Sequence, residues 1–130
     1  MTRKISTRTT WEPVVGYSRA VAAGDFVFVS GCTSVAGGAF VHEGDARAQT
    51  AQAIANVAEA LERLGASLAD VVRTRMFVTD MSRWQEYGRA HGAAFGETMP
   101  ATSMIGIAAL VDPRMLIEVE AVAYKPGVGA

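Results

Sequence analysis

The sequence predicts an α+β domain in which two helices pack on one face of a mixed β-sheet. Short runs of β-branched and aromatic residues recur along the chain between glycines and turn residues, which is typical of strands. Two longer segments instead repeat their apolar residues at the spacing of an amphipathic helix. The elements follow the order β-β-α-β-α-β-β, and two helices of similar length fit most simply on one face of a sheet.

The first two strands are expected at residues 19–23 and 26–30, joined by a turn at Gly24-Asp25. The second strand reads Phe26-Val-Phe-Val-Ser30 and ends at Gly31, and a small residue at a strand end permits close approach of a ligand to the backbone. An ordinary turn is the alternative interpretation of Gly31. Another turn is expected at Gly37-Gly38.

The first helix is expected over residues 45–64. Asp45 can cap its start, and Gly65 suits a left-handed residue at its end. Its apolar stripe consists of Ala51, Ile54, Val57, Ala58, Leu61 and Leu64. The next strand, 71–79, alternates Val72, Thr74, Met76 and Val78 against Arg73, Arg75 and Phe77.

The second helix is expected to open at Ser82, because Ser82 and Gln85 have the spacing of a capping box. Its expected apolar face carries Trp84, Tyr87, His91 and Phe95, and Pro100 ends the segment. Two strands follow, at 103–109 with Gly106 as a bulge and at 115–124. In the last strand, Met115, Ile117, Val119, Ala121 and Ala123 share one face.

The composition gives information on possible binding partners and on the cellular location. The 130 residues include 12 basic and 13 acidic side chains, a net charge of -1, which gives no electrostatic reason to expect a nucleic acid or membrane partner. No apolar run approaches the roughly 20 residues that span a bilayer, and the single Cys32 cannot form an internal disulfide. We therefore expect one cytoplasmic domain over residues 1–130, with a frayed tail from Lys125.

The two helices leave the other face of the sheet uncovered, and a bare sheet face on an apolar chain is a natural oligomer surface. Glu118 and Glu120 share one face of the last strand. An acid buried between subunits needs a partner or an altered pKa. The alternatives are a solvated face or an ion pair with Arg73 or Arg75.

Other reactive side chains give weaker signals. His42 and His91 have no second ligand at metal-binding spacing, so a metal site is not expected, and His91 reads as a packed, hydrogen-bonded residue. Cys32 reads as a buried thiol, because no histidine is placed beside it by sequence. The glycines match neither dinucleotide-binding nor P-loop spacing.

Several segments together resemble a known family. They are Gly16-Tyr17-Ser18 with Ala20, Phe28-Val-Ser-Gly31, Asp70 to Asp80, Pro100-Ala-Thr-Ser103 and Ile117 to Ala123. In this order they resemble the RidA/YjgF family of reactive-intermediate deaminases, also called the endoribonuclease L-PSP family. The likeness covers nearly the whole chain.

The resemblance implies a chorismate-mutase-like fold, a homotrimer with clefts between subunits, and hydrolysis of enamines or imines without a metal or organic cofactor. It implies that Tyr17, Ser30, Gly31 and Glu120 line the cleft, with Glu120 positioning or activating the attacking water. The ligand in the cleft would be a small molecule.

One departure from the family pattern concerns the substrate. The deaminases carry Pro-Ala-Arg-Ser/Thr, whose arginine grips the substrate carboxylate, whereas this chain has Thr102 there. A hydroxyl offers one neutral hydrogen bond in place of a bidentate, charge-assisted pair. Met104 also departs from many members. The chain thus resembles an arginine-lacking branch with a pocket formed partly by Thr102 and Met104, unless Arg73 or Arg75 compensates.

Three functions follow from these observations. The first is a hydrolase of an enamine or imine that lacks the usual carboxylate. The second is a non-catalytic trimer that binds a small molecule or a partner. The third is RNA cleavage, which wants a basic track and an acid-base pair that the charge and the sparse histidines do not supply.

Overall fold

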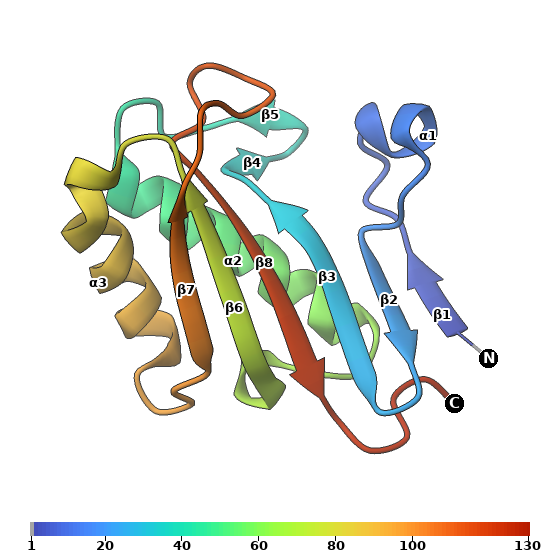
Figure 1. The fold of residues 1–130 in the computed structure, drawn as a ribbon. Coiled ribbons are helices and arrows are strands. Elements are labelled where there is room, and N and C mark those ends of the chain that lie inside the picture. Colours follow the sequence, from blue (N-terminus) through green and yellow to red (C-terminus); the bar gives the residue numbers. More distant parts are fainter. Residues whose placement is uncertain (1) are drawn as a thin grey trace.

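A six-stranded sheet with two helices on one of its faces organises the chain (Figure 1). The structure is a computed structural model that describes residues 2–130. Its elements are β1 (Thr2–Ile5), α1 (Trp11–Val15), β2 (Ala20–Ala23), β3 (Phe26–Cys32), β4 (Val35–Ala36), β5 (Ala39–Phe40), α2 (Ala46–Arg63), the 3-10 turn η1 (Leu68–Asp70), β6 (Val71–Val78), the 3-10 turn η2 (Met81–Arg83), α3 (Trp84–Phe95), β7 (Ala101–Gly106) and β8 (Ile117–Tyr124).

The strand order in the main sheet is β1-β2-β3-β8-β6-β7. Only the pair β6 and β7 is parallel, so the sheet is mixed, and β4 and β5 form a separate two-stranded hairpin. Helices α2 and α3 lie together behind the sheet in Figure 1, and its front face is open. The predicted α+β class and the placement of both helices on one face are therefore confirmed. Within residues 2–130, no helix is long and apolar enough to cross a membrane.

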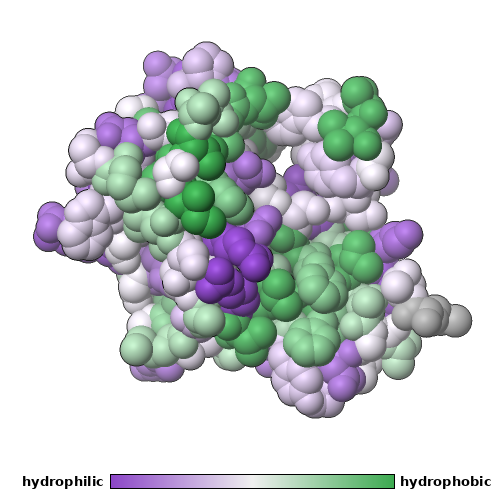
Figure 2. Space-filling model, viewed as in Figure 1, coloured by the Kyte–Doolittle hydropathy of each residue, from purple (hydrophilic) through white to green (hydrophobic). Residues whose placement is uncertain are grey.

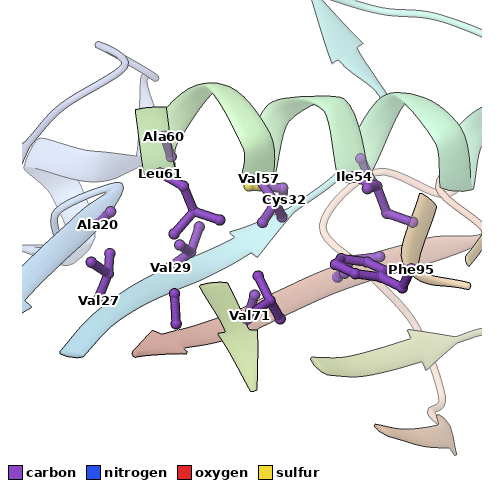
Figure 3. Packing of buried hydrophobic residues seen from close by; sticks show 14 of the residues in the cluster. Ala20, Val27, Val29, Cys32, Ile54, Val57, Ala60, Leu61, Val71 and Phe95 are labelled. Carbon is purple, nitrogen blue, oxygen red and sulfur yellow. The ribbon is translucent and has the colours of Figure 1, made fainter. Parts of the chain in front are cut away.

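The core lies between the sheet and α2. On β8, the side chains of Ile117, Val119, Ala121 and Ala123 are buried, as the alternation predicts. Figure 3 shows side chains of α2, among them Leu61, directed toward the strands. Moving an aliphatic side chain of this size out of water contributes about 1.5–3 kcal/mol to stability.

Helix α2 begins and ends as predicted but buries a broader face. Asp45 Oδ1 accepts from Ala48 N at 2.9 Å, and Gly65 takes a left-handed φ of 88°. Ala51, expected in the core, is exposed, while the polar Gln49 is fully buried. Gln49 Nε2 donates to His42 O and Arg114 O, both at 3.1 Å. The side chain thus ties the helix to two loops, a role that helical periodicity cannot reveal.

Two predicted details in the second half of the chain are wrong. The pairing of β6 with β8 shifts between Val71 and Arg73, so Val72 is exposed although strict alternation placed it with the core residues. The predicted helix start at Ser82 is instead the 3-10 turn η2, which Asp80 caps, with its Oδ1 accepting from Ser82 N at 3.1 Å. Helix α3 starts at Trp84, its N-cap Arg83 makes no capping hydrogen bond, and the Ser82 capping box does not form. Trp84, expected on the apolar face, is exposed.

The chain ends also differ from expectation. Strand β1 and the short helix α1 have no clear signal in the sequence, and β7 spans Ala101–Gly106 without a bulge. The tail is docked instead of frayed. Gly129 N donates to Gly24 O at 2.8 Å, and Val128 is buried. Both ends of the chain therefore pack against the β2–β3 turn region and the neighbouring strand.

Candidate functional site

A hollow of about 1050 Å³ opens where β3 ends and β8 begins. Figure 1 shows α1 and the β4–β5 hairpin beside this end of β3. The N-terminal segment, α2 and the loop before β8 supply further walls. The lining includes Tyr17, Arg19, Ser30, Gly31, Glu118 and Glu120. The four cleft residues that the family resemblance implies therefore lie together in one hollow of the chain: Tyr17, Ser30, Gly31 and Glu120.

A β-bulge shapes the wall of this hollow. Val29 pairs with Ala121 and Cys32 pairs with Val119, so two residues of β3, Ser30 and Gly31, face a single residue of β8. A Cβ atom built on Gly31 would collide with the carboxylate of Glu118. The missing side chain of Gly31 therefore makes the space in which Glu118 lies.

Glu118 is a half-buried acid in the hollow. Within residues 2–130, its carboxylate makes neither a hydrogen bond nor an ion pair. Burial raises its pKa above the ordinary value, the positive charge of Arg19 lowers it, and the negative charge of Glu120 adds to the rise. A carboxyl group with a raised pKa, facing open space, is suited to exchanging protons.

Glu120 lies two residues further along the same face and is engaged. Its Oε1 is 3.2 Å from Arg75 Nη1, directly across from it on β6. The family resemblance implies the water-activating role for Glu120, and an ion pair with Arg73 or Arg75 is the alternative use of the face that Glu118 and Glu120 share. The structure places the ion pair on Glu120, because cross-strand register sets Arg75 opposite Glu120 and Phe77 opposite Glu118. The geometry therefore favours Glu118 for proton transfer.

Tyr17 precedes β2, Ser30 lies near the end of β3, and both line the hollow. Ser30 Oγ donates to Ser18 O at 2.7 Å, which ties the bulge to the start of β2. Tyr17 OH is 3.4 Å from both Thr9 Oγ1 and Arg19 Nη2. The Arg19 guanidinium lies 5.6 Å from the centre of the Tyr17 ring. Sequence reasoning missed Arg19 as part of this site.

Glu12 holds the N-terminal wall in place. Its Oε2 accepts hydrogen bonds from the backbone and the hydroxyl of both Thr7 and Thr9, at 3.0–3.3 Å. Burial opposes ionisation, but the hydroxyl and backbone donors outweigh it and lower the pKa to about 2. The segment carrying Arg8 is thereby fixed at the mouth of the hollow. The Arg8 guanidinium itself makes no hydrogen bond within residues 2–130.

Thr102 and Met104 lie away from this hollow within one chain. They belong to β7, the outermost strand, and in register they stand beside Thr74 and Met76 on the helix-covered side. Thr102 is exposed, and its hydroxyl shares a 2.7 Å hydrogen bond with Thr74 Oγ1. Met104 packs against the core. Thr102 can meet the hollow only if the edge strand of another subunit supplies it.

The remaining reactive side chains have structural surroundings. Cys32 is a buried thiol, as predicted, and burial raises its pKa to about 11. His91 is packed and hydrogen-bonded, as predicted, with Nε2 2.8 Å from Thr74 Oγ1 and its ring 4.6 Å from that of Phe95. Burial lowers the pKa of His91. Among residues 2–130, no three His, Cys, Asp or Glu side chains are grouped to hold a metal ion.

The arrangement can hold a small molecule against a glycine backbone and exchange protons with it through Glu118. Tyr17 offers a hydroxyl and an aromatic face, and the bulge offers backbone groups. General acid-base chemistry needs one titratable group within hydrogen-bond reach of the reacting atom and a pKa near the working pH. Glu118 is the group in the hollow whose environment moves its pKa in that direction.

Comparison with known proteins shows the family of the chain. A family model described as endoribonuclease L-PSP matches residues 7–125. An uncharacterized protein of Streptomyces coelicolor is 35% identical over 126 residues, covering 97% of this chain and 94% of the relative. The 3-aminoacrylate deaminase RutC of Acinetobacter baylyi is 32% identical over 113 residues, covering 86% of this chain and 89% of the relative.

Solved structures share the fold. Rv2704 of Mycobacterium tuberculosis, described as a member of the YjgF/YER057c/UK114 family, matches with a TM-score of 0.87 and 45% identity, covering 95% of this chain and 99% of that one. Yeast Mmf1 matches with a TM-score of 0.85 and 26% identity, covering 96% and 99%. Family model, relatives and fold agree over nearly the whole chain. The chain therefore belongs to the endoribonuclease L-PSP family, also known as the RidA/YjgF family.

Proposed function

We propose that this protein hydrolyses a reactive enamine or imine to a carbonyl compound and ammonia in a cleft between subunits of a homotrimer. A relative of 32% identity is a 3-aminoacrylate deaminase, so this reaction class occurs within the family. The observation that carries the proposal is Glu118, an unpaired acid with a raised pKa against Gly31 in the hollow.

The proposed chemistry needs one group that moves protons. The carboxyl group of Glu118 first protonates the enamine on carbon, which gives the iminium ion and the Glu118 carboxylate. Water then attacks the carbon of the C=N bond, and the Glu118 carboxylate takes a proton from that water. The carbinolamine nitrogen receives this proton from Glu118, the C–N bond breaks, and the hydroxyl proton passes to the Glu118 carboxylate as the carbonyl forms. The products are the carbonyl compound and ammonia, and the steps use no cofactor.

The other cleft residues have supporting roles in this proposal. Tyr17 and the backbone at Ser30 and Gly31 would contact the substrate, because they line the hollow around Glu118. Glu120, to which the sequence analysis gave the catalytic role, remains the alternative acid on the same face. Its ion pair with Arg75 favours a structural part in aligning β6 and β8.

We propose further that the substrate is not a standard 2-iminoacid and that the chain represents an arginine-lacking branch. Thr102 cannot grip a carboxylate as an arginine does. The two arginines considered as replacements are engaged, Arg75 with Glu120 and Arg73 Nη2 with Ser103 Oγ at 2.9 Å. In the trimer, Thr102 from a neighbouring edge strand would help form a less charged pocket. Met104, which packs against the core, would support that strand.

The open face of the sheet supports the trimer. Figure 2 shows a hydrophilic patch near the centre of this face and apolar surface beside it. Phe26, Phe28 and Tyr124 form an aromatic cluster there, with Phe26 and Tyr124 ring centres 5.3 Å apart, and all three are substantially exposed. An exposed aromatic cluster of this kind marks an interaction surface. Three such faces around an axis would bury it.

Two other functions rank lower. A non-catalytic binding trimer would keep the hollow without turnover, and the absent family arginine favours it. RNA cleavage fits poorly, because His91 is packed in the protein and the net charge is -1. We propose a cytoplasmic location, as expected from the sequence.

The two acids can be separated by matched substitutions. We expect Glu118→Gln to lower kcat about 10²- to 10⁴-fold, because it removes the proton acceptor without changing shape. We expect Glu120→Gln to lower kcat less than about fivefold, because a partly exposed ion pair contributes roughly 0–1 kcal/mol. Ammonia release from a panel of imines measures both. A larger loss in Glu120→Gln would reverse the assignment.

Wild-type protein is expected to hydrolyse 2-iminopropanoate slowly. A charged hydrogen bond missing from a desolvated site costs on the order of 2–5 kcal/mol, or about 30-fold to several thousand-fold in rate. Thr102→Arg is expected to accelerate this substrate, and Thr102→Val serves as a control that adds no charge. Strong wild-type activity would contradict the substrate proposal. Inactivity of all three proteins as intact trimers would favour the binding function.

The proposed trimer predicts the mass of the protein in solution. Light scattering of dilute protein should give three times the 13.7 kDa mass of one chain. Phe28→Glu should dissociate it, because a carboxylate would be buried against apolar surface without a partner. Ala55→Glu places the same charge on the exposed side of α2 and should leave the trimer intact. A stable wild-type monomer would rule out a site between subunits.

A further inference from the structure

Arg19 is a buried cation among the residues that line the hollow. It directly precedes β2 and keeps only 7% of its surface exposed. Its backbone joins the sheet, since Arg19 N donates to Ile5 O and Ser30 N donates to Arg19 O, both at 2.9 Å. The side chain therefore starts from a fixed point in the sheet, next to the strand that carries the bulge.

The guanidinium of Arg19 contacts the bulge. Arg19 Nη1 donates to Gly31 O at 2.7 Å and to Ser30 O at 3.1 Å. In a regular strand, successive carbonyl groups point to opposite edges, so one nitrogen reaches two of them in a row only where the strand is distorted. The contact therefore depends on the same bulge that brings Gly31 against Glu118.

The other donors of this guanidinium are also used. Nε lies 3.4 Å from Thr7 Oγ1, and Nη2 lies 3.4 Å from Tyr17 OH. Of the five N–H groups of an arginine, four therefore meet acceptors of the protein. Arg19 is consequently poorly placed to replace the family arginine as a grip for a substrate carboxylate.

Its positive charge has no carboxylate within ion-pair distance in residues 2–130. Burying a charge without a salt-bridge partner is costly, and the carbonyl groups of the bulge offset part of that cost here. The same charge is close enough to Glu118 to lower the pKa of its carboxyl group.

We propose that Arg19 is the positioning residue of the site, whose guanidinium clamps the Ser30–Gly31 bulge and places a fixed positive charge beside Glu118. The assignment rests on the proposed role of Glu118 in proton transfer. Arg19 would touch no reacting atom. It would act by holding the glycine backbone in place and by setting how readily Glu118 gives up its proton.

The charge of Arg19 shifts the pKa of Glu118 in a definite direction. Burial raises the pKa of Glu118, Arg19 lowers it, and Glu120 raises it further. The titratable and charged groups that line the hollow with Glu118 are Arg8, Tyr17, Arg19, Cys32, Glu59, Asp112, Arg114 and Glu120. Arg114 is paired with Asp112, and Glu120 is paired with Arg75. Removing the charge of Arg19 therefore moves the pKa of Glu118 upward.

Two substitutions separate charge from shape. Arg19→Gln removes the charge, and Arg19→Lys keeps it but loses the planar fork. Arg47→Gln, on an exposed position of α2, is the matched control. The readouts are the carbon-13 titration midpoint of the Glu118 carboxyl and the amide signals of Ser30 and Gly31, neither of which needs a substrate. The pH dependence of imine hydrolysis is measured in parallel.

We expect Arg19→Gln to raise the Glu118 midpoint and to move the acid limb of the rate profile to higher pH. Arg19→Lys should leave the midpoint near that of the wild type, shift the two amide signals and lower kcat about tenfold or more. An unchanged titration midpoint of Glu118 in Arg19→Gln would overturn the proposal, and so would unchanged amide signals of Ser30 and Gly31 in Arg19→Lys. If Arg19→Gln does not fold, Arg19→Lys alone decides. If both readouts respond but no imine is hydrolysed, the positioning role stands and the proposed function fails.

Discussion

The close approach of Gly31 to Glu118 is the constraint on which the rest of the site depends. A side chain at residue 31 would occupy the volume of the Glu118 carboxylate. The bulge that produces this contact also preserves the core. Val27 and Val29 face the helices before it, and Cys32 faces them after it, because the extra residue shifts the alternation by one. One local irregularity thus turns the end of β3 toward the hollow without exposing apolar side chains.

Within residues 2–130, the charged groups around this contact leave Glu118 without a partner. Arg75 neutralises Glu120 on the open face of the sheet, and Arg114 pairs with Asp112 in the loop before β8. Arg19 is occupied by the carbonyl groups of the bulge. Glu118 is left half-buried, unpaired and with a raised pKa. Proton transfer to a small molecule is the chemistry that such a residue performs best.

Periodicity and turn residues were sufficient to predict most of the fold, and they failed where backbone irregularity or a distant partner decides. The exposure of Val72 follows from a bulge in β6, and the docking of the tail follows from a hydrogen bond between Gly129 and Gly24. In the site, the family resemblance predicted Tyr17, Ser30, Gly31 and Glu120, and all four line the hollow of one chain. The resemblance assigned the water-activating role to Glu120, and only the pairing of β6 with β8 shows that Glu120 meets Arg75 while Glu118 has no partner there. Arg19 carried no signal, since its role depends on a bulge that alternation does not reveal.

The contact between residues 31 and 118 can be measured without a substrate. A double-mutant cycle of urea unfolding compares Gly31→Ala in the wild-type background with Gly31→Ala in a Glu118→Ala background. Overpacking typically costs about 1–3 kcal/mol, and it should largely disappear once the glutamate side chain is removed. A coupling free energy of about 1 kcal/mol or more would support the account. Additive effects, with Gly31→Ala equally destabilising in both backgrounds, would contradict it.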